Sequence, residues 1–182
     1  MSRVYLGSDW HLGHKNIAKY GQRTHIETID DNYSWIADNY QLTNRDTLFL
    51  LGDIVFEERA LFFLQSLPGQ KYLIGGNHDF ERGPHVDMYE VARTFDGVWG
   101  MRSYGNSKND TKCWLTHCPI HESEMRRKNY NVHGHIHNEE TNHIIRADKR
   151  YVNVNVDVMW PKEQQVCMNF QELMEKVKKG DY

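Results

Sequence analysis

Apolar residues in the first half of the chain fall into short runs that alternate with stretches of helical spacing. The apolar runs, residues 4–8, 47–51 and 71–74, are bounded by turn residues and are typical of buried strands. Helical spacing is found between them and after them, over residues 28–40, 57–67 and 84–94. This strand–helix alternation predicts βαβ units, and therefore an α/β fold with a parallel core sheet.

The second half of the chain has a different pattern. Residues 98–104 and 112–115 predict a hairpin across the polar turn 105–110, and residues 121–128 predict a short helix. Apolar and polar residues alternate over 151–158, which favours a half-buried strand. Residues 131–137 indicate a brief strand that runs into a turn, and residues 170–179 an amphipathic helix. Because no linker or repeat divides the chain, we expect one domain over residues 1–182.

Composition limits the classes of protein to be considered. The net charge of −3 argues against a broad basic face for duplex nucleic acid. The three cysteines are odd in number and no pair has CxxC spacing, which predicts a reducing compartment rather than a disulfide framework. No secretory leader or apolar run long enough to span a membrane is recognisable. We therefore expect a cytoplasmic protein without a membrane partner.

Candidate metal ligands follow the predicted strands. Asp9 comes directly after the first apolar run, while Asp53 and Asn77 follow the second and third runs with only glycine between. Function gathers at the carboxyl ends of parallel strands, so these three oxygen donors are expected to lie close together. The chain also has eleven histidines, and histidine is the commonest metal-binding side chain.

Five clusters combine such donors, and their members share a spacing that suits a common site. In Asp9-x-His11 and His135-x-His137 the two residues are i, i+2, on the same side of an extended segment. The clusters are Asp9-Trp10-His11, Gly52-Asp53, Gly76-Asn77-His78-Asp79, His117 and Gly134-His135-Ile136-His137. Mixed oxygen and nitrogen donors suit Mn²⁺, Fe, Zn²⁺ or Ni²⁺. The set is too large for one ion with an open position and suits two divalent ions that share one ligand.

The ordered set of motifs resembles the calcineurin-like metallophosphoesterase family over residues 9–137. The resemblance implies an α/β sandwich, αββα, in which two mixed β-sheets are flanked by helices. It also implies a dinuclear centre, with Mn²⁺ as the first choice of ion. In this reading Asp9, His11 and His137 bind one ion, Asn77, His117 and His135 bind the other, and Asp53 bridges them.

The resemblance also gives roles to His78 and Asp79. His78 would bind no metal and would protonate the leaving oxygen, while Asp79 would orient His78 by a hydrogen bond. The implied reaction is hydrolysis of a phosphate ester by a metal-activated water. A phosphodiester is preferred, including a cyclic nucleotide or other short nucleotide substrate. A phosphomonoesterase, a binding scaffold of the same fold, and a nuclease are the alternatives.

Several residues near the motifs can be interpreted in two ways. His14 either faces the substrate or caps a helix, and Trp10 either stacks on a base or packs in the core. Arg126, in a short basic run, either meets a phosphate-rich substrate or belongs to a solvated face. Cys118 next to His117 is expected to be a small buried residue rather than a reactive thiol. The natural substrate, the ion and the oligomeric state are not encoded in any recognisable pattern.

Overall fold

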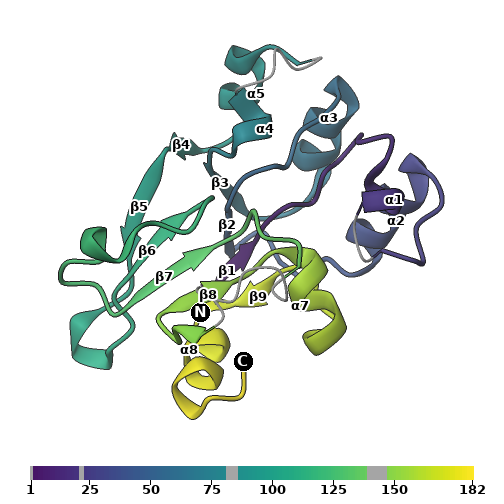
Figure 1. Ribbon diagram of the computed structural model, residues 1–182. Coiled ribbons are helices and arrows are strands. Elements are labelled where there is room, and N and C mark those ends of the chain that lie inside the picture. Colours follow the sequence, from purple (N-terminus) through teal and green to yellow (C-terminus); the bar gives the residue numbers. More distant parts are fainter. Residues whose placement is uncertain (1, 21–22, 81–85, 139–146) are drawn as a thin grey trace.

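The computed structural model describes residues 2–20, 23–80, 86–138 and 147–182. Its first sheet has the strand order β4-β3-β2-β1-β9 (Figure 1). The neighbours β1 to β4 are parallel and β9 is antiparallel to β1, so the sheet is mixed. Its strands are β1 (Val4–Gly7), β2 (Thr47–Leu50), β3 (Gln70–Ile74), β4 (Gly97–Trp99) and β9 (Met168–Asn169).

The second sheet has the order β5-β6-β7-β8, with β5 antiparallel to β6 and the other pairs parallel. Its strands are β5 (Met101–Tyr104), β6 (Cys113–Thr116), β7 (Tyr130–His133) and β8 (Tyr151–Asn153). The predicted hairpin is confirmed by the pairing of β5 with β6. The single strand predicted over residues 98–104 is wrong, because the chain changes sheets at Gly100. Apolar and aromatic residues lie on both sides of Gly100, so composition alone does not reveal the break.

The helices agree with the predicted positions at most places. Thr28 caps α2 with a reciprocal capping box to Asp31, which explains why the helix begins there. The described helices are α1 (Ile17–Tyr20), α2 (Ile29–Asp38), α3 (Glu58–Ser66), α4 (Asn77–Phe80), α5 (Met88–Thr94), α7 (Val156–Glu163) and α8 (Phe170–Lys179).

Two predictions in the second half need correction. The strand predicted over 151–158 ends at Asn153, because the Asn155 side chain accepts the N–H of Asp157 and starts α7. The helix predicted over 121–128 is only one 3₁₀ turn, Glu122–Glu124. Local alternation of apolar residues could not show that a capping side chain interrupts the strand.

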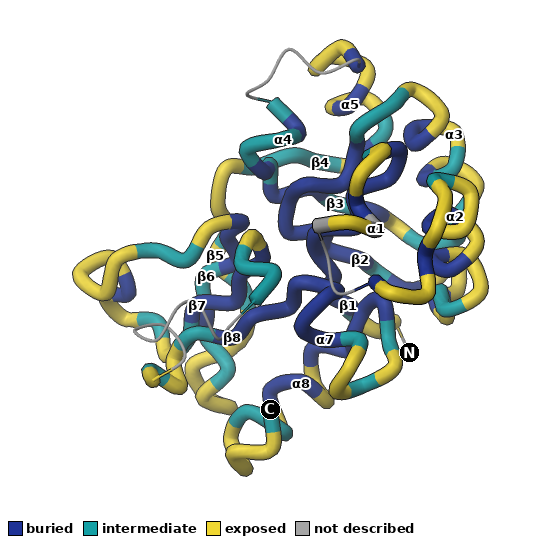
Figure 2. The backbone as a smooth tube through the Cα atoms, turned by 45° about the vertical axis from the view of Figure 1, so that its right-hand side comes forward, coloured by how far each residue is buried: buried dark blue, intermediate teal, exposed yellow. Residues whose placement is uncertain are grey.

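Two apolar cores lie on opposite faces of the first sheet. Leu48 and Leu50 of β2 pack with α2 and α3, whereas Phe49 and Leu51 face the second sheet and α8. The central strands are therefore buried on both faces, as Figure 2 shows for β1 and β2. The predicted sandwich of two mixed sheets with flanking helices is confirmed.

The two sheets are joined at one edge by backbone contacts. Ser8 at the end of β1 forms a parallel bridge with Asn155 just beyond β8. At the same edge, the N–H of Val156 donates to the carbonyl of Ser8 at 3.1 Å. The loops that carry the predicted ligands leave the strands at this edge, so both sheets contribute to one site.

Candidate metal centre

The predicted ligands gather where the strands of both sheets end. Asp9 follows β1 closely, Asp53 follows β2 and Asn77 begins α4 after β3. His117 follows β6 directly, and His135 and His137 follow β7. The parallel order of β1, β2 and β3 places their three loops side by side, which is what the motif positions predicted.

Four of these residues have left-handed backbone conformations. The φ angles are 60° at Asp9, 51° at His11, 56° at Asp53 and 67° at His135. A non-glycine residue in this region costs roughly 1–2 kcal/mol. Concentration of this cost at predicted ligands indicates that the tertiary structure holds their side chains in place for a purpose other than stability.

Three glycines allow the loops to approach closely. A Cβ at Gly52 would lie 2.3 Å from the ring of His117, and one at Gly76 would lie 2.3 Å from Asp53 Oδ1. A Cβ at Gly134 would lie 1.9 Å from Ser8 Oγ. Glycine is needed at these three positions because any side chain there would displace a neighbouring donor.

One group of donors consists of Asp9, His11 and His137, with ligand atoms within 4.8 Å of one another. Asp9 Oδ2 accepts the N–H of His135 at 2.9 Å and lies 2.5 Å from Ser8 Oγ, which leaves Oδ1 directed to the histidines. His137 Nε2 is 3.5 Å and His11 Nε2 is 3.8 Å from Asp9 Oδ1. Burial lowers the pKa of His11 to about 4, so its imidazole is neutral at pH 7 and able to bind a cation.

The other group is built around His117. Its Nε2 is 3.0 Å from Asn77 Oδ1, 3.4 Å from Asp53 Oδ1 and 3.2 Å from His135 Nδ1. Its Nδ1–H donates to the carbonyl of Leu51 at 2.7 Å and fixes the ring. Asp53 also lies within 4.8 Å of ligand atoms of both Asp9 and His117, so it connects the two groups.

Unsatisfied buried polar atoms indicate that these donors suit bound cations. Asp9 Oδ1 and both ring nitrogens of His11 are buried and have no hydrogen-bond partner in the part of the chain that the structure describes. Such orphaned polar atoms cost free energy unless another partner satisfies them. A divalent ion between Asp9, His11 and His137 would satisfy Asp9 Oδ1 and one ring nitrogen of His11. Asp53, Asn77, His117 and His135 offer the donors for a second ion.

Two buried residues that the sequence patterns did not single out support the first group. Asp157 Oδ2 accepts the Nδ1–H of His137 at 2.6 Å, which directs Nε2 toward Asp9. Arg23 Nε donates to the other oxygen of Asp157 at 2.5 Å, and its Nη1 donates to the carbonyl of Trp10 at 2.9 Å. Burial alone would raise the pKa of Asp157, but His137 and Arg23 hold it at about 2. No local motif marks either residue. The one sequence signal for Asp157 is its charge within an apolar segment, and Arg23 lies among polar residues.

Asp79 acts differently from its predicted role. Its Oδ2 accepts the N–H groups of Asp53 and Gly76 at 2.8 and 2.9 Å, and its Oδ1 accepts those of Ile54 and Val55 at 2.9 and 3.2 Å. Among the described residues it makes no hydrogen bond to the His78 ring. The predicted bond is therefore wrong, because four backbone N–H groups already occupy both oxygens.

His78 stands at the open side of the site. Its side chain is 31% exposed, and its Nε2 lies 3.9 Å from Asp53 Oδ2. Its backbone N–H donates to Asp53 Oδ1 at 2.9 Å. Phe56, which the sequence patterns did not single out, packs its ring against those of His11, His14 and His78 at centroid distances of 4.8, 4.8 and 5.3 Å.

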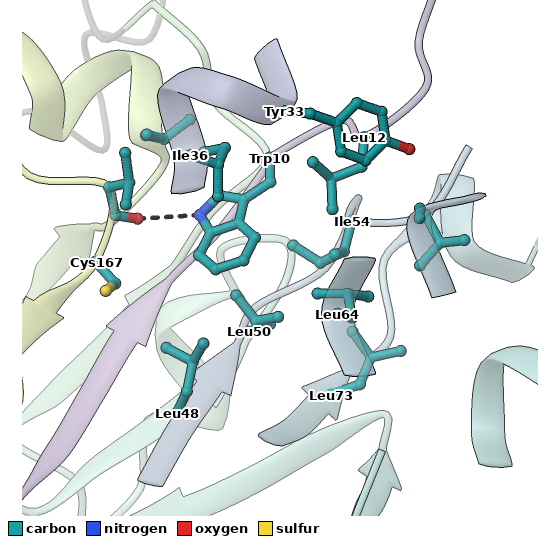
Figure 3. Close-up of a cluster of buried hydrophobic side chains, with 14 of the residues drawn as sticks. Trp10, Leu12, Tyr33, Ile36, Leu48, Leu50, Ile54, Leu64, Leu73 and Cys167 are labelled. Atoms are coloured by element: carbon teal, nitrogen blue, oxygen red, sulfur yellow. Dashed lines mark hydrogen bonds between the residues drawn. The ribbon is translucent and has the colours of Figure 1, made fainter. Parts of the chain in front are cut away.

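For some of the residues with two interpretations, the structure decides between them. Trp10 is fully buried and donates from Nε1 to the carbonyl of Val166 at 3.0 Å, so it packs in the core (Figure 3). His14 is near the site through Phe56, and it also accepts the N–H of Asn16. Arg126 is exposed and pairs with Glu124 at 3.3 Å. The prediction that Cys118 is buried is wrong, since this residue is exposed while Cys113 and Cys167 are buried.

Comparison with known proteins agrees with this geometry. The sequence model of the family described as calcineurin-like phosphoesterase matches residues 2–177. The Gene 66 protein of Mycobacterium phage L5 is 27% identical over 189 aligned residues, covering 86% of this chain and 87% of that protein. Uncharacterized protein MJ1445 of Methanocaldococcus jannaschii is 27% identical over 169 residues, covering 87% and 84%.

A solved structure has the same fold. The crystal structure of AQ665, a protein of unknown function from Aquifex aeolicus, has a TM-score of 0.71 and 21% sequence identity. The match covers 96% of this chain and 99% of that one. At this identity the likeness supports the arrangement of sheets and helices, and it carries no statement about activity.

Proposed function

This chain belongs to the calcineurin-like phosphoesterase family, and from that premise we propose that it hydrolyses phosphodiesters of small substrates with two divalent ions. Family membership implies metal-dependent hydrolysis of phosphate esters. The observation that carries the proposal is the pair of donor groups connected by Asp53, in which Asp9 Oδ1 and the His11 ring are buried without hydrogen bonds. A scaffold would not need these unsatisfied donors.

The proposed ligands divide as the two groups do. Asp9, His11 and His137 would hold one ion, while Asn77, His117 and His135 would hold the other, and Asp53 would bridge them. We propose Mn²⁺ as the principal ion, with Fe, Zn²⁺ and Ni²⁺ as alternatives that accept the same donors. Two such ions supply a Lewis acid for the phosphoryl oxygens and lower the pKa of water.

The remaining residues bind, orient and transfer protons. His78, with its partly exposed ring, is proposed to protonate the leaving oxygen, which typically contributes about 10²- to 10⁴-fold in rate. Asp79 holds the loop that presents Asp53 by accepting four backbone N–H groups. Asp157 keeps the Nδ1–H of His137 engaged, so that Nε2 remains the donor to the centre.

We also propose which phosphodiesters are the substrates. His14 lies beside Phe56 and His78 at the open side of the site, which favours a contact with the substrate. Arg126 is proposed to meet a second phosphate, since it is exposed and basic. A short nucleotide diester with a second phosphate would use both contacts, whereas a cyclic mononucleotide would use only that of His14. No duplex nucleic acid is expected. We propose that residues 1–182 form one catalytic domain acting in the cytoplasm.

Among the described residues, no helix combines the length and the apolar character that a bilayer crossing requires.

The proposal is tested by comparing hydrolysis of bis-p-nitrophenyl phosphate and p-nitrophenyl phosphate after loading with Mn²⁺. We expect release mainly from the diester, with Asp53→Ala losing metal and activity and His78→Ala losing activity while keeping its metal. His25→Ala is the matched histidine control, because the His25 ring contacts Trp35 and Trp160 and none of the proposed ligands. Release mainly from the monoester would show that the enzyme hydrolyses phosphomonoesters instead of phosphodiesters. Absence of release with Mn²⁺, Fe²⁺, Zn²⁺ and Ni²⁺ would favour the scaffold alternative.

A further inference from the structure

A thiol lies at the edge of the second donor group. Cys118 follows His117, and its Sγ is within 4.8 Å of ligand nitrogens of both His117 and His135. Cys118 is exposed, whereas Cys113 and Cys167 are buried in the cores. The thiol that lies beside two imidazoles is thus also the accessible one.

The neighbourhood of this thiol points to a cation independently. His117 also belongs to the group with Asp9 and Asp53, whose ligand atoms lie within 4.8 Å of one another. In that group Asp9 Oδ1 is fully buried and makes no hydrogen bond. Cys118 therefore borders a cluster whose neighbouring donor group contains an unsatisfied buried oxygen.

We propose that Cys118 is a sulfur ligand to the ion held by Asn77, His117 and His135. The proposal rests on the dinuclear centre of the proposed function and adds a donor to it. Ligand bonds of about 2.3 Å to sulfur and about 2.0–2.1 Å to imidazole nitrogen put S and N roughly 3.5 Å apart around a tetrahedral ion. An exposed side chain at up to 4.8 Å reaches that separation by a small rotation.

A sulfur ligand makes the two positions chemically different. The group of Asp9, His11 and His137 offers oxygen and nitrogen donors, which suit Mn²⁺ and similar ions. The position beside Cys118 offers sulfur as well, and thiolates select softer ions such as Zn²⁺ or Co²⁺. The centre is therefore a mixed one, with a thiophilic ion at the position of His117 and His135.

Cobalt gives a direct spectroscopic test. The Co²⁺-loaded protein is expected to show a sulfur-to-cobalt charge-transfer band in the near ultraviolet, and Cys118→Ser is expected to lose that band while keeping the weaker visible d–d bands. Cys167→Ala is the matched control and should keep both, because its sulfur is buried in a core. Visible bands without the charge-transfer band in the unmodified protein would overturn the role of Cys118 and leave the metal centre standing. Absence of Co²⁺ binding would overturn both.

Thiol alkylation tests the proposal on the unmodified protein, so the test does not depend on whether a variant folds. In the metal-free protein, iodoacetamide is expected to modify Cys118 and spare the two buried cysteines, as peptide mass mapping would show. Zn²⁺ at 100 times its Kd should slow that modification about 100-fold, because only the unbound fraction reacts. An unchanged alkylation rate in Zn²⁺-saturated protein would contradict coordination by the sulfur.

Discussion

Asp79→Asn separates two roles that a carboxylate beside His78, the proposed proton donor, could have. Asp79 is fully buried, and its two oxygens accept backbone N–H groups from Asp53, Ile54, Val55 and Gly76. Asparagine keeps the shape but replaces one oxygen by an NH₂ group. Whichever oxygen is replaced, two N–H groups then face a donor instead of an acceptor.

The magnitude follows from that count. A buried N–H left without a partner costs about 1–3 kcal/mol, so Asp79→Asn should lower the free energy of unfolding by about 2–6 kcal/mol. This is a large part of the 5–15 kcal/mol typical of a domain. The assay is urea unfolding of the metal-free protein, where the midpoint should fall while the slope stays unchanged. Asp38→Asn, at an exposed helix position, is the matched control and should change stability by less than about 0.5 kcal/mol.

The same variant should also bind metal more weakly, because the N–H of Asp53 is one of the groups that Asp79 holds. His78→Ala should leave both stability and metal binding nearly unchanged. A stable Asp79→Asn protein with full metal content and a rate defect equal to that of His78→Ala would refute this reasoning. It would show that Asp79 acts through His78 after all.

Three further predictions concern the support of the site and its ionisation. Asp157→Asn should weaken metal affinity about 10- to 100-fold in a metal titration, because the Nδ1–H of His137 loses its carboxylate partner; an unchanged affinity would contradict this role. Metal uptake at pH 7 should release a proton, since Asp53 overcomes the effect of burial and raises the pKa of His117 to about 9; calorimetry in two buffers of different ionisation enthalpy should detect it, and equal heats would contradict it. Burial alone would raise the pKa of Asp46, but hydrogen bonds from the N–H and hydroxyl of Thr43 lower it. The Asp46 carboxylate should therefore stabilise the fold fully above the pKa of about 4 that it has in the unfolded chain, and this stabilisation should be lost as the pH falls. The difference in free energy of unfolding between the unmodified protein and Asp46→Asn should shrink as the pH is lowered. A difference that stays constant with pH would refute this role of Asp46.

Much of the site was predictable because its ligands lie in short local motifs. Asp9, Asp53 and Asn77 follow three strands that pair in parallel, so the order of strands and helices alone brings their loops to one edge. The helix Phe170–Lys179 was also predicted at its exact bounds, because Asn169 caps it and Gly180 ends it. In these places local propensity and the tertiary structure favour the same conformation.

Where long-range contacts decide, the sequence patterns were insufficient or misleading. Gly100 separates two strands that belong to different sheets, although apolar residues continue across it. Asn155 ends a strand pattern and begins a helix by accepting one N–H. The two-residue strand Met168–Asn169 is too short to give a periodic signal and exists through its pairing with β1.

The sequence by itself determined the types of the candidate ligands, their order and the strand ends that carry them. Tertiary structure alone decided how the ligands are supported. Arg23 reaches Asp157 across 134 residues of sequence, and Asp79 reaches Ile54 across 25. Local spacing holds no information on such pairs, because a buried charge takes whichever partners the folded chain brings within hydrogen-bonding distance. The accessible position of Cys118 beside His117 likewise depends on the packing of the loops and not on the order of residues.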